Sequence, residues 1–95
     1  MKGYVVCVYK SISSEEKLKE YAVKAIAAVE NYKGKFLIRG GRSRTNEGDK
    51  SPRTVVIEFP SYDDANLFYN SKEYQKAHEI LKGHVVRQHQ TIQGS

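Results

Sequence analysis

The sequence predicts an α+β protein in which one antiparallel sheet of four strands carries its helices on a single face. The strand-like and helical segments of its 95 residues follow the order strand, helix, strand, strand, helix, strand. The first strand-like segment is apolar on both faces, which requires cover on each side of the sheet. The length suits one hydrophobic core, so residues 1–95 are expected to form a single domain.

Composition narrows the class of protein. A chain with 39% hydrophobic and 28% charged residues is typical of a folded domain. No apolar run approaches the roughly 20 residues that span a bilayer, and the N-terminus leads directly into a strand, so we expect a cytoplasmic protein without a membrane partner. The net charge of +5 is spread over the chain and indicates solubility. The lone Cys7 is expected to be a buried thiol.

The first predicted strand covers Tyr4–Lys10, a segment rich in valine and tyrosine. Its side chains alternate between two apolar faces, with Tyr4, Val6 and Val8 on one and Val5, Cys7 and Tyr9 on the other.

The first predicted helix begins with a capping box, in which Ser13 is followed by Glu16. Apolar residues then recur at helical spacing: Leu18, Tyr21, Ala22, Ala25, Val29 and Tyr32. The helix is expected to end near Lys33, because Gly34 can adopt the left-handed conformation that closes a helix.

Two further strands, Lys35–Arg42 and Arg53–Pro60, flank the polar stretch Ser43–Pro52 and predict a hairpin with a long loop. Gly40 and Gly41 favour a bulge or a strand end in the first of them.

The second helical region contains two potential caps, Ser61 and Ser71. The helix is therefore expected to break or bend around Asn70 and Ser71. Gly83 ends it, and Val85–Gln93 forms the last strand.

This order is the ferredoxin-like βαββαβ arrangement, which places both helical regions on one side of the sheet. The other face of the sheet is then left open. Because the first strand is apolar on both faces, a homodimer that covers the open face is predicted.

Four motifs in this order also suggest a family: Phe36–Arg42, Glu47–Asp49, Ile57–Ser61, and Ser71 followed three residues later by Tyr74. Together they resemble the bacterial domain-of-unknown-function family 1330 over nearly the whole chain. The resemblance implies a dimeric α/β barrel, in which two four-stranded sheets pack face to face with the helices outside, and it implies no established activity. The same superfamily contains cofactor-independent monooxygenases and isomerases, so the fold allows chemistry without specifying it.

Two positions depart from the family pattern. Ser11–Ser14 replaces an acidic residue expected just after the first strand, and Lys82 stands where arginine is common. A polar site that depended on those positions would differ in this chain.

One candidate site pairs Arg39 with Glu58, which are predicted to share a sheet face with Leu37 and Val56 on neighbouring antiparallel strands. A partly buried pair could hold a carboxylate or position a proton donor. A structural ion pair inside the dimer interface is the favoured interpretation.

Histidine and tyrosine supply the other candidates. His78 shares the apolar stripe of the second helix with Tyr74 and could be a general base, although a histidine satisfied within the core is commoner. Four tyrosines could line a pocket or simply belong to the core: Tyr4, Tyr9, Tyr21 and Tyr74. His84 and His89 should face opposite sides, and no cysteine or acidic residue stands at metal spacing, so neither a metal site nor a cofactor is expected.

The leading hypothesis is a dimeric domain that binds a small organic molecule near Tyr21, Arg39, Glu58, Tyr74 and His78. A cofactor-independent enzyme of monooxygenase or isomerase type on the same scaffold is the alternative. Nucleic-acid binding is not expected, because Thr54 and Val56 stand where an RNA recognition motif needs stacking aromatic residues.

Overall fold

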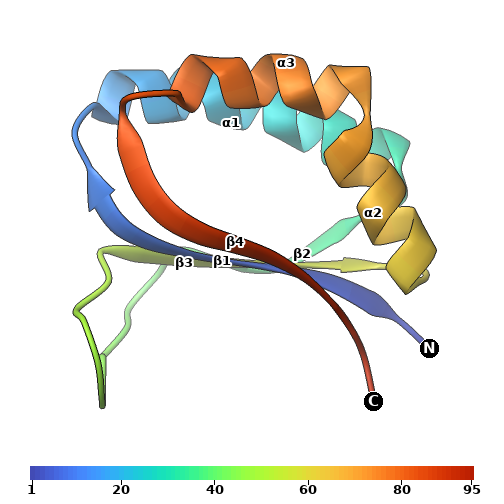
Figure 1. Cartoon of the computed structure of the whole chain (residues 1–95), viewed down its shortest axis with the longest axis horizontal. Helices are drawn as coiled ribbons and strands as arrows, with labels where there is room; N and C mark the ends of the chain where they lie inside the picture. Colours follow the sequence, from blue (N-terminus) through green and yellow to red (C-terminus); the bar gives the residue numbers. More distant parts are fainter.

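The computed structural model describes residues 1–95 as one four-stranded sheet with three helices. The elements are β1 (Gly3–Ile12), α1 (Glu15–Asn31), β2 (Lys35–Arg39), β3 (Arg53–Phe59), α2 (Tyr62–Asn70), α3 (Lys72–Leu81) and β4 (Val85–Gln93). The strand order is β2-β3-β1-β4 and every pair is antiparallel, which confirms the predicted ferredoxin-like fold. All helices lie on one face of the sheet (Figure 1). None is long and apolar enough to cross a membrane.

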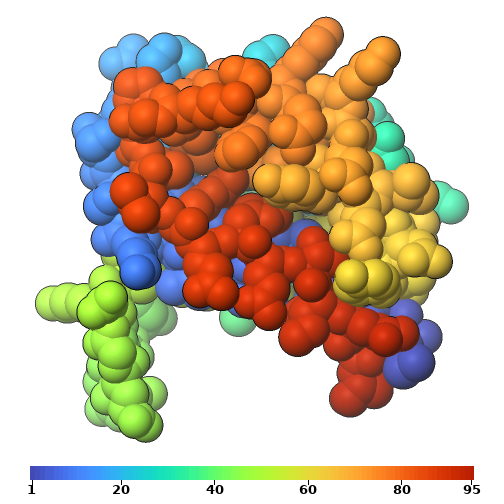
Figure 2. Space-filling model, viewed as in Figure 1, coloured from blue at the N-terminus to red at the C-terminus, as the bar shows by residue number.

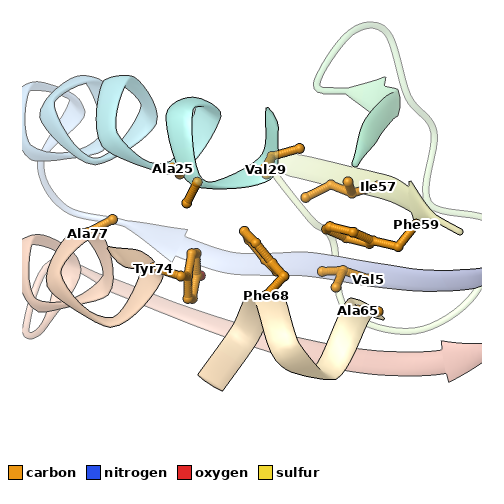
Figure 3. Close-up of a cluster of buried hydrophobic side chains, with 10 residues drawn as sticks. Val5, Ala25, Val29, Ile57, Phe59, Ala65, Phe68, Tyr74 and Ala77 are labelled. Atoms are coloured by element: carbon orange, nitrogen blue, oxygen red, sulfur yellow. The ribbon is translucent and has the colours of Figure 1, made fainter. Parts of the chain in front are cut away.

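The hydrophobic core lies between the helices and the covered face of the sheet. The predicted alternation in β1 is confirmed, since Val5, Cys7 and Tyr9 are at most 3% exposed beneath the helices. From the helix side, Phe68 packs on Phe59 with ring centroids 4.9 Å apart (Figure 3).

The start of α1 differs by one residue from the prediction. Ser14, not Ser13, is the N-cap, and its hydroxyl accepts a hydrogen bond from the Lys17 amide at 3.1 Å. The Ser13 hydroxyl instead donates to the carbonyl oxygen of His84 at 3.0 Å. Ser13 therefore ties the start of α1 to the residue before β4, and the neighbouring Ser14 caps the helix.

The end of α1 also differs. Lys33, not Gly34, adopts the left-handed conformation, with φ of 61°. Glycine is needed at position 34 for a different reason: a Cβ there would lie 2.7 Å from side-chain atoms of Phe59 and Val29.

The predicted break in the second helical region is confirmed at Ser71, which ends α2 and begins α3. Its hydroxyl donates to the Phe68 carbonyl oxygen at 2.7 Å and accepts from the Tyr74 amide at 3.0 Å. This turn places Tyr74 in the core, where it is 1% exposed.

Strand β2 ends at Arg39, three residues earlier than predicted. It also contains a bulge before Arg39, whereas the bulge or strand end was predicted at Gly40 and Gly41. Phe36 is opposite Ile57, but Ile38 is opposite Val56, so the register shifts by one residue between them. Such a bulge turns every following side chain to the other face of the sheet.

The predicted pairing of Arg39 with Glu58 is therefore wrong. The shift sets Arg39 opposite Val55, on the helix-covered face. Glu58 is opposite Tyr4, on the other face, where its carboxylate lies 3.6 Å from the Lys2 amine. The two residues consequently lie on opposite sides of the sheet.

We call the face of the sheet opposite the helices the open face. Its register rows contain Tyr4, Val6, Val8, Ile38, Thr54, Val56, Glu58, Gln88, Gln90 and Ile92. The loop of residues 40–52, here the projecting loop, extends on this side of the sheet, as does the C-terminal end (Figure 1). In space-filling view these two segments frame a hollow beneath the sheet (Figure 2).

Candidate functional site

A cavity of about 60 Å³, here the inner cavity, lies between α1 and the covered face of the sheet. Its walls are mainly apolar and include Val5, Leu18, Ala22, Ala25, Ile26, Val29, Phe36, Val55, Ile57 and Phe68. Its polar lining consists of Cys7, Tyr9, Tyr21, Arg39, Arg53, Tyr74, Arg87 and His89. The lining thus holds three arginines and no carboxylate.

Arg87 is the centre of the polar part of the cavity. It is opposite Tyr9 in the β1–β4 register, and Tyr9 is in turn opposite Arg53 on β3. The Arg87 guanidinium donates to the hydroxyls of Tyr9 and Tyr74, each at 3.0 Å. Longer contacts of 3.4 Å reach the Tyr21 hydroxyl and the Cys7 sulfur.

The Arg87 guanidinium has no acidic partner. The ion pairs of the protein are elsewhere, between Lys2 and Glu58, Lys10 and Asp49, Lys17 and Glu20, and Lys82 and Glu79. Burial opposes the charge of Arg87, but the oxygens of Tyr21 and Tyr74 outweigh this effect and raise its pKa above the ordinary value. The cavity therefore contains a permanent, partly buried positive charge.

Two of the three tyrosine hydroxyls around Arg87 are hydrogen-bonded to each other. Tyr21 and Tyr74 share a hydrogen bond of 2.8 Å between their oxygens. Burial raises the pKa of Tyr9 to about 12 and also raises the pKa of Tyr74. The phenols of Tyr9 and Tyr74 therefore stay protonated at neutral pH, so they solvate the cation without neutralising it.

His89 connects this cluster to a second hollow. Its Nε2 lies 3.5 Å from the Tyr74 hydroxyl, and its ring packs on Tyr69 with centroids 5.0 Å apart. Burial, with a contribution from Arg87, lowers the pKa of His89 to about 3, so the imidazole is neutral at physiological pH. On the far side lies an open groove of about 450 Å³, here the outer groove, lined by Tyr69, His78, Leu81, Lys82, Val85, Val86, Arg87 and His89. Arg87 and His89 line both hollows.

The structure brings together three of the five predicted site residues. Tyr21 and Tyr74 are hydrogen-bonded, and the His78 ring stacks on Tyr74 with centroids 6.2 Å apart. Burial lowers the pKa of His78, as do Arg87 and Lys82.

The other predicted residues are distributed differently. Arg39 lines the inner cavity with its guanidinium carbon 4.5 Å from the centre of the Phe36 ring. Glu58 takes no part. Of the other two tyrosines, Tyr9 joins the cluster, whereas Tyr4 is on the open face.

Arg87 and His89 are not among the predicted site residues, although their strand was predicted correctly. Residues 87–91 of β4 are all polar, so hydrophobic patterning does not indicate which face of this stretch is covered. The pairing of β4 with β1 in the structure supplies the missing signal. Once that register is known, Arg87 and His89 fall opposite the buried residues Tyr9 and Cys7.

No three histidine, cysteine, aspartate or glutamate side chains converge where they could hold a metal ion. The arrangement instead has the properties of an anion site: an unpaired guanidinium, hydroxyl donors and an apolar enclosure.

Comparison with known proteins identifies the family and the fold. The family model described as "Domain of unknown function (DUF1330)" matches residues 2–95, so the chain belongs to this family, as the sequence motifs predicted. No curated protein matches the sequence.

Solved structures show the fold at low sequence identity. A protein of unknown function from Rhodopseudomonas palustris matches with a TM-score of 0.78 and 12% identity, over 99% of this chain and 82% of that one. A dimeric ferredoxin-like protein of unknown function from Jannaschia sp. matches at 0.69 and 10%, over 99% and 100%. A cofactor-independent oxygenase from Streptomyces nogalater matches at 0.66 and 10%, over 99% and 93%.

Proposed function

We propose that this member of the DUF1330 family binds a small organic anion in the inner cavity, with Arg87 as the group that holds the negative charge. One observation carries the proposal: a partly buried guanidinium at a cavity wall has only phenol and thiol partners, with no carboxylate in ion-pair reach. An isolated cation in an apolar site is expensive unless a counter-charge joins it. A bound carboxylate or enolate would supply that charge.

The cavity limits the size of the anion. A volume of about 60 Å³ is room for a few water molecules. A ligand that enters without large movements of the walls therefore has a carbon skeleton of only a few atoms. The apolar walls favour hydrocarbon groups over hydroxyl groups on that skeleton. Short-chain carboxylates fit both requirements.

The test is a titration followed by amide NMR spectra with acetate, propionate and butyrate. Propionamide and propylamine serve as neutral and cationic controls of similar size. Carboxylates should shift the signals of β1, β4 and α1 near the cavity, and the controls should not. Arg87→Met should weaken carboxylate binding by about tenfold or more, the value of a charge-assisted hydrogen bond. Arg44→Met, on the projecting loop, is the matched control. Equal binding of carboxylate and amide would refute the proposal.

We also propose that the chain acts as a homodimer joined through the open face. Val8, Ile38 and Ile92 on that face are 36%, 48% and 45% exposed in the single chain. The projecting loop and the C-terminal end flank the face, where they would contact a second copy on either side (Figure 2). The similar protein from Jannaschia sp. is described as dimeric. Sedimentation at micromolar concentration tests this proposal, and a monomer there would contradict it.

A second candidate function is a cofactor-independent enzyme of isomerase type. The hydrogen bonds that join Tyr21, Tyr74 and the neutral His89 favour it, because they link the cavity to a potential proton acceptor.

A further inference from the structure

We propose that the anion site is also a proton-transfer site, in which Tyr21, Tyr74 and His89 carry a proton between a ligand in the inner cavity and the outer groove. Arg87 holds the negative charge that the departing proton leaves on the ligand. This inference rests on the proposed anion site and names its substrate class: small carbonyl compounds with an acidic C–H bond.

The path is continuous and joins two separate hollows. Tyr21 and Tyr74 line the inner cavity, and their hydroxyl oxygens lie 2.8 Å apart. The Tyr74 hydroxyl is 3.5 Å from Nε2 of His89. His89 lines both the inner cavity and the outer groove. A proton that leaves a ligand beside Tyr21 therefore has hydrogen-bonded steps to a residue at the wall of the groove.

The tautomer of His89 sets the direction of these hydrogen bonds. With the proton on Nδ1, Nε2 accepts from the Tyr74 hydroxyl, and Tyr74 then accepts from Tyr21. The Arg87 guanidinium donates to both phenol oxygens, at 3.4 Å to Tyr21 and 3.0 Å to Tyr74. Its positive charge stabilises negative charge that develops on either oxygen during the transfer.

The reaction needs no further reactant. The C–H bond of the ligand breaks and its electron pair moves through the new C=C bond to the carbonyl oxygen, which becomes an enolate oxygen beside Arg87. The proton bonds to the Tyr21 oxygen while the Tyr21 proton passes to Tyr74 and the Tyr74 proton passes to Nε2 of His89. The imidazolium then releases the Nδ1 proton to water. Reversal of these steps returns a proton to carbon or to oxygen, so the net reaction is keto–enol exchange.

The basicity of His89 selects the ligand. Its neutral imidazole can accept a proton, but burial and Arg87 make it a weak base. A suitable C–H bond is therefore already acidic, as in a methylene between two carbonyl groups. An enolate beside Arg87 offsets part of the charge that lowers the basicity of His89, so binding of the anion favours the transfer.

The experiment uses acetylacetone, a small 1,3-diketone whose enol absorbs ultraviolet light and whose keto form absorbs much less. Enol-rich acetylacetone is diluted from an apolar solvent into buffer, and the decay of absorbance gives the rate of ketonisation. The whole chain should accelerate the decay beyond an equal concentration of free imidazole. Tyr74→Phe and His89→Gln should each reduce the acceleration by about 100-fold, the usual contribution of a general acid–base group.

Matched controls are Tyr62→Phe and His84→Gln, which remove the same functional groups outside the cavity and should retain the wild-type rate. Butyrate titrations and thermal unfolding of every variant establish that each one binds an anion and folds. If the wild type and Tyr74→Phe bind butyrate and give equal rates, the proton path is refuted and the anion site stands. If the wild type binds no carboxylate, the proposed function fails as well.

Discussion

Replacement of Arg87 by methionine separates a functional cation from a structural one. The substitution removes two hydrogen bonds of 3.0 Å, to Tyr9 and Tyr74, and two longer contacts. A hydrogen bond from a charged donor contributes about 1.5–3 kcal/mol, so the two short ones sum to about 3–6 kcal/mol. The substitution also removes the desolvation penalty of an unpaired, partly buried cation, which stabilises the folded state by roughly several kcal/mol. The hydrogen bond between Tyr21 and Tyr74 remains, and the methionine side chain keeps the apolar packing.

These opposing contributions nearly cancel. We therefore expect Arg87→Met to change the free energy of unfolding by less than about 1.5 kcal/mol while it weakens anion binding by about tenfold or more. Urea denaturation followed by circular dichroism measures the change, with Arg44→Met as the surface control expected within about 0.5 kcal/mol of wild type. A loss greater than about 3 kcal/mol would show that Arg87 with its phenol partners is a structural cation, which contradicts its role as an anion-binding group.

Three further predictions concern the fold and its assembly. Val6→Lys places a charge in the centre of the open face and should convert the proposed dimer to monomer, which sedimentation detects; a dimer that persists in this variant would locate the interface elsewhere. The pKa of His89 is about 3 in the folded chain and 6.5 when unperturbed, so the unfolded state binds more protons between these values and stability should fall as pH decreases through this window. In His89→Gln the decline measured by urea denaturation at pH 7, 5.5 and 4 should be shallower, and an identical pH profile would argue against a buried neutral imidazole. Gly34→Ala should destabilise the protein by about 1–3 kcal/mol, because the added Cβ would lie 2.7 Å from side-chain atoms of Phe59 and Val29. A thermal midpoint equal to that of the wild type would show that these side chains move aside at no cost in stability.

Most of the fold could be predicted from the sequence because local signals agree with the tertiary structure. Alternation in β1 and the two caps at Ser61 and Ser71 correctly indicated which faces are buried and where the helices break. The sequence pattern indicates the wrong cap of α1, because only Ser13 has a glutamate three residues later. In the structure the Ser13 hydroxyl donates to the His84 carbonyl oxygen, and Ser14 caps the helix.

The candidate site was predicted only in part, because it depends on register. Tyr21 and Tyr74 were identified from helical spacing, which is local. The bulge in β2 reverses the face of Arg39, and nothing in the order of residues 36–39 specifies where the extra residue falls. Arg87 and His89 lie in the all-polar stretch 87–91 of β4, so their burial follows from the pairing of β4 with β1 and from the helices above them.

The most direct test of the anion site is a crystal structure of the protein grown in butyrate. We expect a butyrate carboxylate within about 3 Å of the Arg87 guanidinium, with its hydrocarbon chain in the inner cavity. A butyrate bound only at Arg39 or Arg53, or an Arg87 that keeps its phenol partners beside an empty cavity at saturating butyrate, would contradict it.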